Sequence, residues 1–157
     1  MQMPKPTAQH QKLEALAGTW TGEEKLHPSP WDAAGGAALG KWVMRMDLDG
    51  LFLIADYTQE RGGKVNFRGH GVYSWDDKAQ CYTQVWFDSM TMAPLGTRAI
   101  RGEWKGDALV YEHEMMPGAR ARYTFRLEGG RLVSLVENSK DGGKEWAPFM
   151  EGRYTRS

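Results

Sequence analysis

Most of the chain divides into short stretches in which hydrophobic and polar residues alternate, and turn-forming pairs separate these stretches. Alternation with a period of two is typical of β-strands that bury one face. Pairs such as Gly62-Gly63, Pro117-Gly118 and Gly129-Gly130 are short enough for tight hairpins. The pattern predicts ten strands, at residues 19–26, 37–48, 51–60, 64–75, 79–88, 98–105, 108–116, 119–128, 131–139 and 145–155.

One stretch near the start has helical spacing instead. Thr7 is a suitable N-cap, Leu13 and Leu16 lie three residues apart on one face, and Gly18 follows as a C-cap. We therefore predict a short helix over 7–17, preceded by a disordered lead at 1–6. Trp20 comes just after the glycine turn, and we expect its indole to plug the end of a barrel.

The connections between the predicted strands are mostly too short for parallel crossovers, so neighbouring strands must be antiparallel. Ten such strands in an open sheet would leave two edges exposed, and closure removes both edges. The predicted fold is all-β: a single antiparallel up-and-down barrel over 19–155, with one short N-terminal helix, in one domain spanning 1–157.

Composition narrows the classes of partner. Twenty basic and twenty acidic residues give zero net charge, and the two signs are interspersed, so electrostatics favours neither nucleic acid nor a membrane as a partner. No window of eighteen consecutive apolar residues exists. Cys81 is the single cysteine and the first residues lack a signal-peptide pattern, so we predict a cytoplasmic location. Nineteen glycines and seven tryptophans suit an all-β protein with many turns.

Several motifs taken together resemble a bacterial family of uncharacterised proteins, DUF1579. They are Gly18-Thr19-Trp20-Thr21-Gly22 with the following His27-Pro28-Ser29-Pro30-Trp31, then Phe67-Arg68-Gly69-His70-Gly71, Trp86-Phe87-Asp88-Ser89 and the closing Glu151-Gly152-Arg153-Tyr154. Members of the family look like lipocalin-type (calycin) barrels. Over nearly the whole chain, the resemblance therefore implies a barrel that holds a ligand.

Nitrobindin-like barrels also begin with Gly-x-Trp, and they hold haem through a histidine near the C-terminus. This chain has no histidine after His113, and Met150 is a weak substitute as a haem ligand. The four histidines are scattered without the spacing of a metal site. We therefore predict neither haem nor any other cofactor, and no metal.

The sharpest local feature is Arg68-Gly69-His70-Gly71. If the apolar faces of the strands at 64–75 and 79–88 align, Arg68 and His70 share a face with Trp86 and Asp88. Arg68 would then bind an anionic or carbonyl group, and His70 would act as acid or base with Asp88 orienting it. In the alternative interpretation, Arg68 and Asp88 form a structural ion pair and His70 is half exposed.

Further candidates complete the predicted ligand-binding set. The tryptophans and tyrosine would line a pocket or simply fill the barrel, Asp56 needs a partner such as Arg45 or Arg68, and His113 would face a cavity or the core. Met90 would cover the barrel mouth or contribute to a homo-oligomer contact. The residues are Trp42, Arg45, Asp56, Tyr82, Trp86, Met90 and His113.

Three functions follow from these residues. The leading one is a carrier or sensor of a small, mainly apolar or amphipathic ligand held inside the barrel. The alternative is a cofactor-free enzyme of the isomerase, lyase or cyclase type, with His70 as acid or base and Arg68 stabilising an oxyanion. The third is a structural barrel whose interior is filled.

Overall fold

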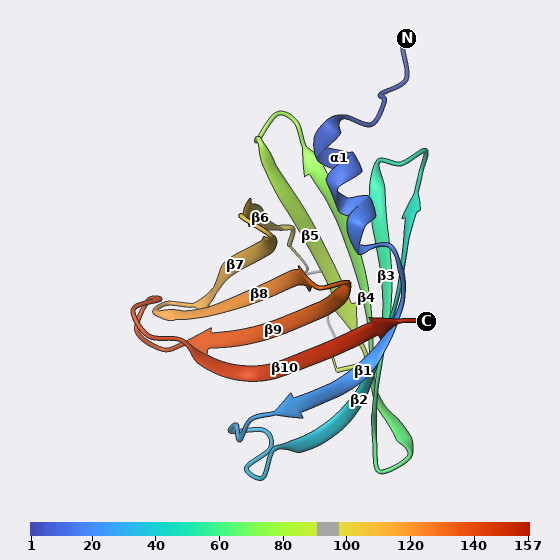
Figure 1. The fold of residues 1–157 in the computed structure, drawn as a ribbon. Helices are drawn as coiled ribbons and strands as arrows, with labels where there is room; N and C mark the ends of the chain where they lie inside the picture. Colours follow the sequence, from blue (N-terminus) through green and yellow to red (C-terminus); the bar gives the residue numbers. More distant parts are fainter. Residues whose placement is uncertain (91–97) are drawn as a thin grey trace.

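The computed structural model describes residues 1–90 and 98–157. It forms a closed antiparallel barrel in which each strand pairs with its neighbours in sequence and β1 closes the ring on β10 (Figure 1). The strands are β1 (Gly18–Leu26), β2 (Gly36–Asp47), β3 (Phe52–Arg61), β4 (Lys64–Asp76), β5 (Cys81–Asp88), β6 (Ile100–Lys105), β7 (Ala108–Met116), β8 (Ala119–Glu128), β9 (Arg131–Ser139) and β10 (Ala147–Arg156). The predicted fold class is confirmed.

The strand boundaries agree with the alternation pattern to within two residues. The largest differences lie in β5, β6 and β10, which begin at Cys81, Ile100 and Ala147 instead of 79, 98 and 145. The first hydrogen-bonded residue of a strand depends on its neighbour and is not marked by residue type, so differences of one or two residues are expected.

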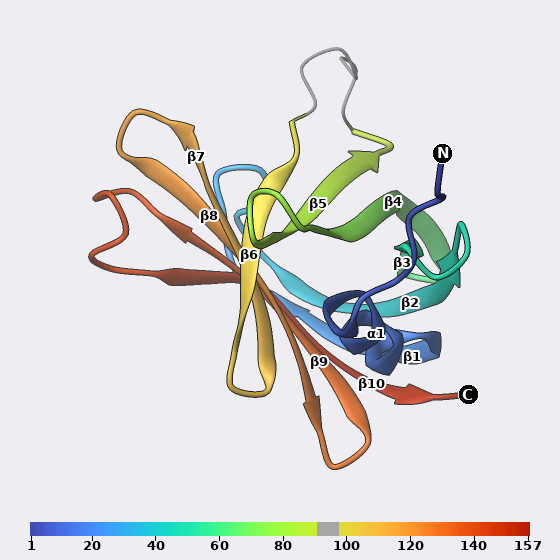
Figure 2. The same cartoon turned by 90° about the horizontal axis from the view of Figure 1, so that it is seen from above.

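The helical segment lies at one end of the barrel, between the upper ends of β5 and β3 in Figure 1 and in front of the strands in Figure 2. It is shorter than predicted, because α1 (Ala8–Leu13) gives way to a 3₁₀ turn at Glu14–Leu16. Leu13 and Leu16 are almost completely buried in the barrel core. Across the described ranges, no helix is long and apolar enough to cross a membrane.

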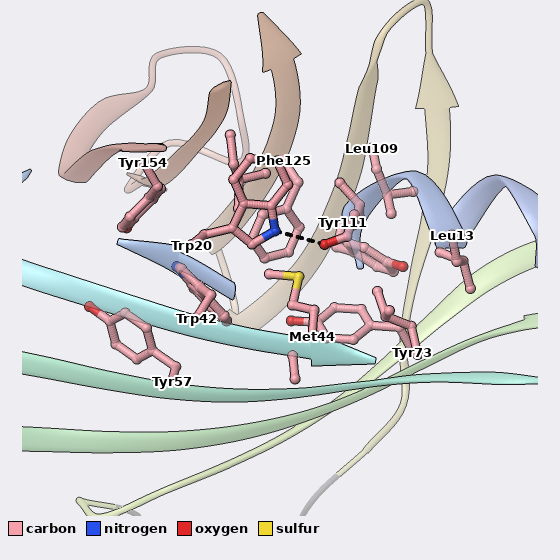
Figure 3. Packing of buried hydrophobic residues seen from close by; sticks show 14 of the residues in the cluster. Leu13, Trp20, Trp42, Met44, Tyr57, Tyr73, Leu109, Tyr111, Phe125 and Tyr154 are labelled. Atoms are coloured by element: carbon pink, nitrogen blue, oxygen red, sulfur yellow. Dashed lines mark hydrogen bonds between the residues drawn. The ribbon is translucent and has the colours of Figure 1, made fainter. Parts of the chain in front are cut away.

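Trp20 fixes the segment to the barrel. Its indole is buried, and Nε1 donates a hydrogen bond to the carbonyl oxygen of Leu16 at 2.9 Å (Figure 3). Gly18, with φ of +137°, makes the turn between the 3₁₀ segment and β1. The Arg156 guanidinium covers the Trp20 ring at 4.4 Å from the centroid. Trp20 therefore closes this end of the barrel beneath the helix.

Candidate functional site

The barrel interior contains a cavity of about 720 Å³, on the side away from α1. This volume lies in the usual range for sites that bind small molecules. A group of aromatic rings from β2, β3, β4, β5 and β8 forms one part of its wall. These rings belong to Trp42, Tyr57, Phe67, Tyr73, Trp86 and Phe125.

Trp42 is the centre of this aromatic wall. Its ring centroid lies 4.4 Å from that of Tyr57, 5.4 Å from that of Phe125 and 5.8 Å from that of Trp86. Tilted and edge-to-face contacts at such distances are favourable and hold the rings in fixed orientations. The cavity therefore presents a continuous aromatic surface to whatever enters it.

The two glycines of the Arg68-Gly69-His70-Gly71 motif face this interior. A Cβ atom at Gly69 would overlap the Trp86 indole, and one at Gly71 would overlap the Tyr73 ring. The glycines therefore make room for two aromatic walls of the cavity.

Behind the wall lies a buried carboxylate, that of Glu24, with only 3% of the residue exposed. The hydroxyl of Tyr154 donates to Oε1 at 2.6 Å, the hydroxyl of Tyr57 lies 2.8 Å from both oxygens, and Nε2 of Gln59 donates to Oε2 at 2.8 Å. Gly40 gives the Glu24 side chain its space, because a Cβ there would overlap the carboxylate. The oxygens of Glu24 accept hydrogen bonds that suit an ionised carboxylate, which can only accept.

The two tyrosine hydroxyls that donate to Glu24 stay protonated. Burial raises the pKa of Tyr57, and the negative charge of Glu24 raises it further. The pKa of Tyr154 is raised by the same two causes in the same order. Both hydroxyls therefore remain hydrogen-bond donors at neutral pH.

Gln84 supplies a second polar group on the cavity wall. The residue is 4% exposed and its Nε2 donates to the Tyr73 hydroxyl at 3.2 Å. Its Oε1 has no hydrogen-bond partner among residues 1–90 and 98–157. A buried carbonyl oxygen without a donor costs stability, and its burial keeps it out of reach of a molecule in the cavity.

The loop between β1 and β2 borders the cavity and is fixed on both sides. Arg61 bonds Asp32 Oδ2 at 2.6 Å and the carbonyl oxygen of Gly35 at 2.7 Å. The Arg61 hydrogen bond is the main cause that lowers the pKa of the Asp32 carboxyl. At the start of the loop, His27 Nε2 lies 2.6 Å from Glu151 Oε2. These contacts give the mouth of the cavity a defined shape.

Several predicted site residues do meet in the cavity. Trp42, Trp86, Asp88 and Met90 all line it. Trp86 Nε1 donates to Asp88 Oδ2 at 3.1 Å, and the Met90 backbone N–H donates to Asp88 Oδ1 at 2.9 Å. The Asp88 carboxylate therefore links the Met90 backbone to the Trp86 indole.

Two further predicted residues are turned inward but do not line the cavity. His113 stacks on the Tyr123 ring with centroids 5.9 Å apart, and burial lowers its pKa. The Tyr123 side chain forms part of the cavity wall. Tyr82 lies at the other end of the barrel, where its hydroxyl donates to the Gln9 carbonyl oxygen at 2.8 Å.

The predicted placement of Arg68 and His70 beside Trp86 and Asp88 is wrong. Asp88 pairs with Gly69, and His70 pairs with Phe87, so Arg68 and His70 are on the outer face. The assumption failed because the inner face of β5 carries Gln84 and Asp88 while Val85 and Phe87 point outward. On β5, the face that lines the cavity is therefore not the more apolar of the two.

Outside the barrel, His70 joins two other predicted residues. His70 Nδ1 lies 2.7 Å from Asp56 Oδ1, and Arg45 Nη1 lies 3.4 Å from Asp56 Oδ2. The side chains of all three are about half exposed. Asp56 thus has Arg45 as its partner, one of the two expected, in a surface cluster separated from the cavity by the sheet.

Sequence reasoning missed Glu24, Gln59, Tyr57 and Tyr154. A signal for Glu24 was present, because it lies four residues after Trp20 in an alternating strand. An inward Trp20 therefore turns Glu24 inward as well. Nothing comparable in the sequence marks Tyr154 as its partner, since the two residues meet only when β10 closes on β1.

No three His, Cys, Asp or Glu side chains converge to hold a metal ion in the described part of the chain. Two side chains that could ligate haem iron, His27 and Met150, line the cavity. His27 contacts Glu151, and the Met150 sulfur lies 3.7 Å from the Tyr57 hydroxyl. The expectation of no haem stays a prediction.

These features define a class of protein, a ten-stranded antiparallel barrel with an aromatic cavity in its interior. A family model described as "Protein of unknown function (DUF1579)" matches residues 5–156, and the chain belongs to this family. No curated protein matches it. Its structure is similar to the crystal structure of Rv2717c from M. tuberculosis, with a TM-score of 0.67 and 15% sequence identity over 96% of this chain and 98% of that chain. At this identity the similarity concerns the fold alone.

Proposed function

We propose that this protein binds a small, mainly apolar molecule inside the barrel and acts as a carrier or sensor in the cytoplasm. The observation that carries the proposal is the cavity of about 720 Å³ with its continuous aromatic wall. Apolar walls with a few fixed polar groups are typical of sites that bind small organic ligands. Here the polar side chains on the wall include Asn66, Asp88 and Asn138.

The other two functions have less support. A structural barrel with a filled interior would leave no space of this size. The enzyme hypothesis required His70 and Arg68 to act on a molecule in the cavity, and both lie on the outer face. Binding is therefore the function that the interior supports best.

A neutral dye tests the proposal. N-phenyl-1-naphthylamine, which fluoresces strongly in apolar surroundings, should bind saturably with one molecule per chain. Val136→Trp places an indole in the cavity and should weaken binding about tenfold or more. The matched control is Val133→Trp, on the outward-facing side of the same strand, which should leave the affinity unchanged. Absence of saturable binding, or equal loss in both variants, would contradict the proposal.

A further inference from the structure

The charged groups of the barrel interior are unbalanced. Arg61 is the one Arg or Lys among the described residues that lines the cavity, and it is committed to Asp32 and the Gly35 carbonyl. Asp88 adds a carboxylate to the wall, and Glu24 lies behind it. Residues 91–97 carry no charged side chain in the sequence. The net charge around the cavity is therefore negative.

The negative charge of Glu24 is solvated by neutral groups alone. Its hydrogen bonds come from two phenols and an amide, which satisfy its oxygens without adding positive charge. Within the described ranges, no Arg, Lys or His forms an ion pair with it. A buried carboxylate in this situation makes its surroundings favourable for a cation.

Tyr57 connects this charge to the cavity. Its ring lines the cavity, while its hydroxyl lies 2.8 Å from both Glu24 oxygens. A phenol that donates to a carboxylate has a more electron-rich ring, so its face attracts a cation more strongly. Trp42 at 4.4 Å and Phe67 at 5.9 Å, measured between ring centroids, extend the same surface.

We propose that the ligand is an organic cation, with an apolar body and an amine or quaternary ammonium group held against the faces of Tyr57, Trp42 and Trp86. The inference rests on the proposed function and specifies its ligand class. An ammonium group there gains cation–π contacts and the field of Glu24 and Asp88. A fatty acid or other anion would meet two carboxylates and an arginine that is already paired.

The test uses three ligands with one phenylalkyl body, ending in a trimethylammonium, a tert-butyl or a carboxylate group. Binding is followed by calorimetry and by tryptophan emission, since Trp42 and Trp86 both lie in the wall. We expect the cation to bind about tenfold more tightly than the neutral isostere, and the anion to bind most weakly. If the neutral or anionic member binds as tightly as the cation, the inference is overturned and the proposed function stands. If none of the three binds and the neutral dye also fails, both are overturned.

Substitutions at Glu24 and Asp88 test whether these carboxylates cause the preference for a cationic ligand. Glu24→Gln keeps the size and an acceptor oxygen but removes the charge, so the ratio of cation to neutral affinity should fall about fivefold. Glu23→Gln makes the same change of charge on the exposed neighbouring residue and should leave the ratio unchanged. Asp88→Asn, at the rim, should lower the ratio as well, and it tests the inference if Glu24→Gln does not fold. The inference is overturned if Asp88→Asn has the same ratio of cation to neutral affinity as the wild type and Glu24→Gln either has that ratio too or does not fold.

Discussion

Removal of one hydroxyl group, in Tyr154→Phe, tests the hydrogen bonding around the buried carboxylate. The ring of Tyr154 is completely buried, and its hydroxyl donates to Glu24 Oε1 at 2.6 Å. Phenylalanine keeps the ring and its packing. The substitution therefore removes a charge-assisted hydrogen bond and little else.

The size of the effect follows from these contacts. A hydrogen bond to a charged group contributes about 1.5–3 kcal/mol to stability, and removing the donor leaves a buried acceptor less well satisfied. Tyr57 and Gln59 remain bonded to Glu24, so its charge is not left without donors. For a chain of this length, the expected loss corresponds to a fall of about 3–12 °C in Tm.

Urea unfolding followed by tryptophan fluorescence gives the free energy of unfolding for each variant. The matched control is Tyr111→Phe. Tyr111 is also completely buried, but its hydroxyl has no hydrogen-bond partner among the residues described. Its removal should change the free energy of unfolding by no more than about 0.5 kcal/mol, or stabilise the protein slightly.

The comparison can refute the reasoning directly. If Tyr154→Phe and Tyr111→Phe unfold at the same urea concentration, the hydrogen bond to Glu24 adds nothing to stability. If Tyr111→Phe is the more destabilised of the two, packing around the phenol oxygen matters more than its hydrogen bonds. Either result would also mean that the hydrogen bonds from the tyrosines and Gln59 do not stabilise an ionised Glu24.

Three further predictions concern packing and pH. Gly69→Ala should lower the free energy of unfolding by about 1–3 kcal/mol in urea titrations, because the new Cβ overlaps the Trp86 indole, and an unchanged midpoint would contradict that packing. Leu13→Ala should cost about 2–5 kcal/mol by the same measurement, because Leu13, the last residue of α1, is fully buried against the barrel core; a cost near zero would mean that the helix is not docked. Burial lowers the pKa of His113 below its ordinary value of 6.5, so the unfolded chain takes up a proton first and stability falls as the pH drops through 6.5. Thermal unfolding between about pH 7 and pH 5 should show a smaller fall in His113→Phe, and an identical fall would show that His113 does not contribute.

The strand order and boundaries could be predicted because turn chemistry is local. Gly62-Gly63 and Gly129-Gly130 each join two strands directly, with all four glycines at positive φ, and such pairs are visible in the sequence without knowledge of tertiary contacts. The antiparallel closure then followed from the cost of open edges. The helix was predicted too long because residues 14–16 satisfy the same spacing in a 3₁₀ turn.

The site was less predictable because it depends on which face of each strand points inward. Trp86 and Asp88, two of the candidate residues, do line the cavity, whereas His70 was expected beside them on the assumption that apolar faces align. Phe87 shows why that assumption fails: it is partly exposed on the outer face, while polar Gln84 is buried on the inner one. A strand that lines a cavity alternates between two mixed faces, and residue types alone do not distinguish them.

The pairing of β1 with β10 has a consequence for how the chain acquires its structure. Trp20 lies opposite Arg156, so the seam of the barrel joins segments from opposite ends of the sequence. During synthesis β1 can pair with β2 as soon as that hairpin has emerged, whereas its other edge stays unpaired until β10 has left the ribosome. Because closure joins segments far apart in the sequence, we expect it to be a slow step of folding, and until it occurs the free edge of β1 can pair with other copies of the chain.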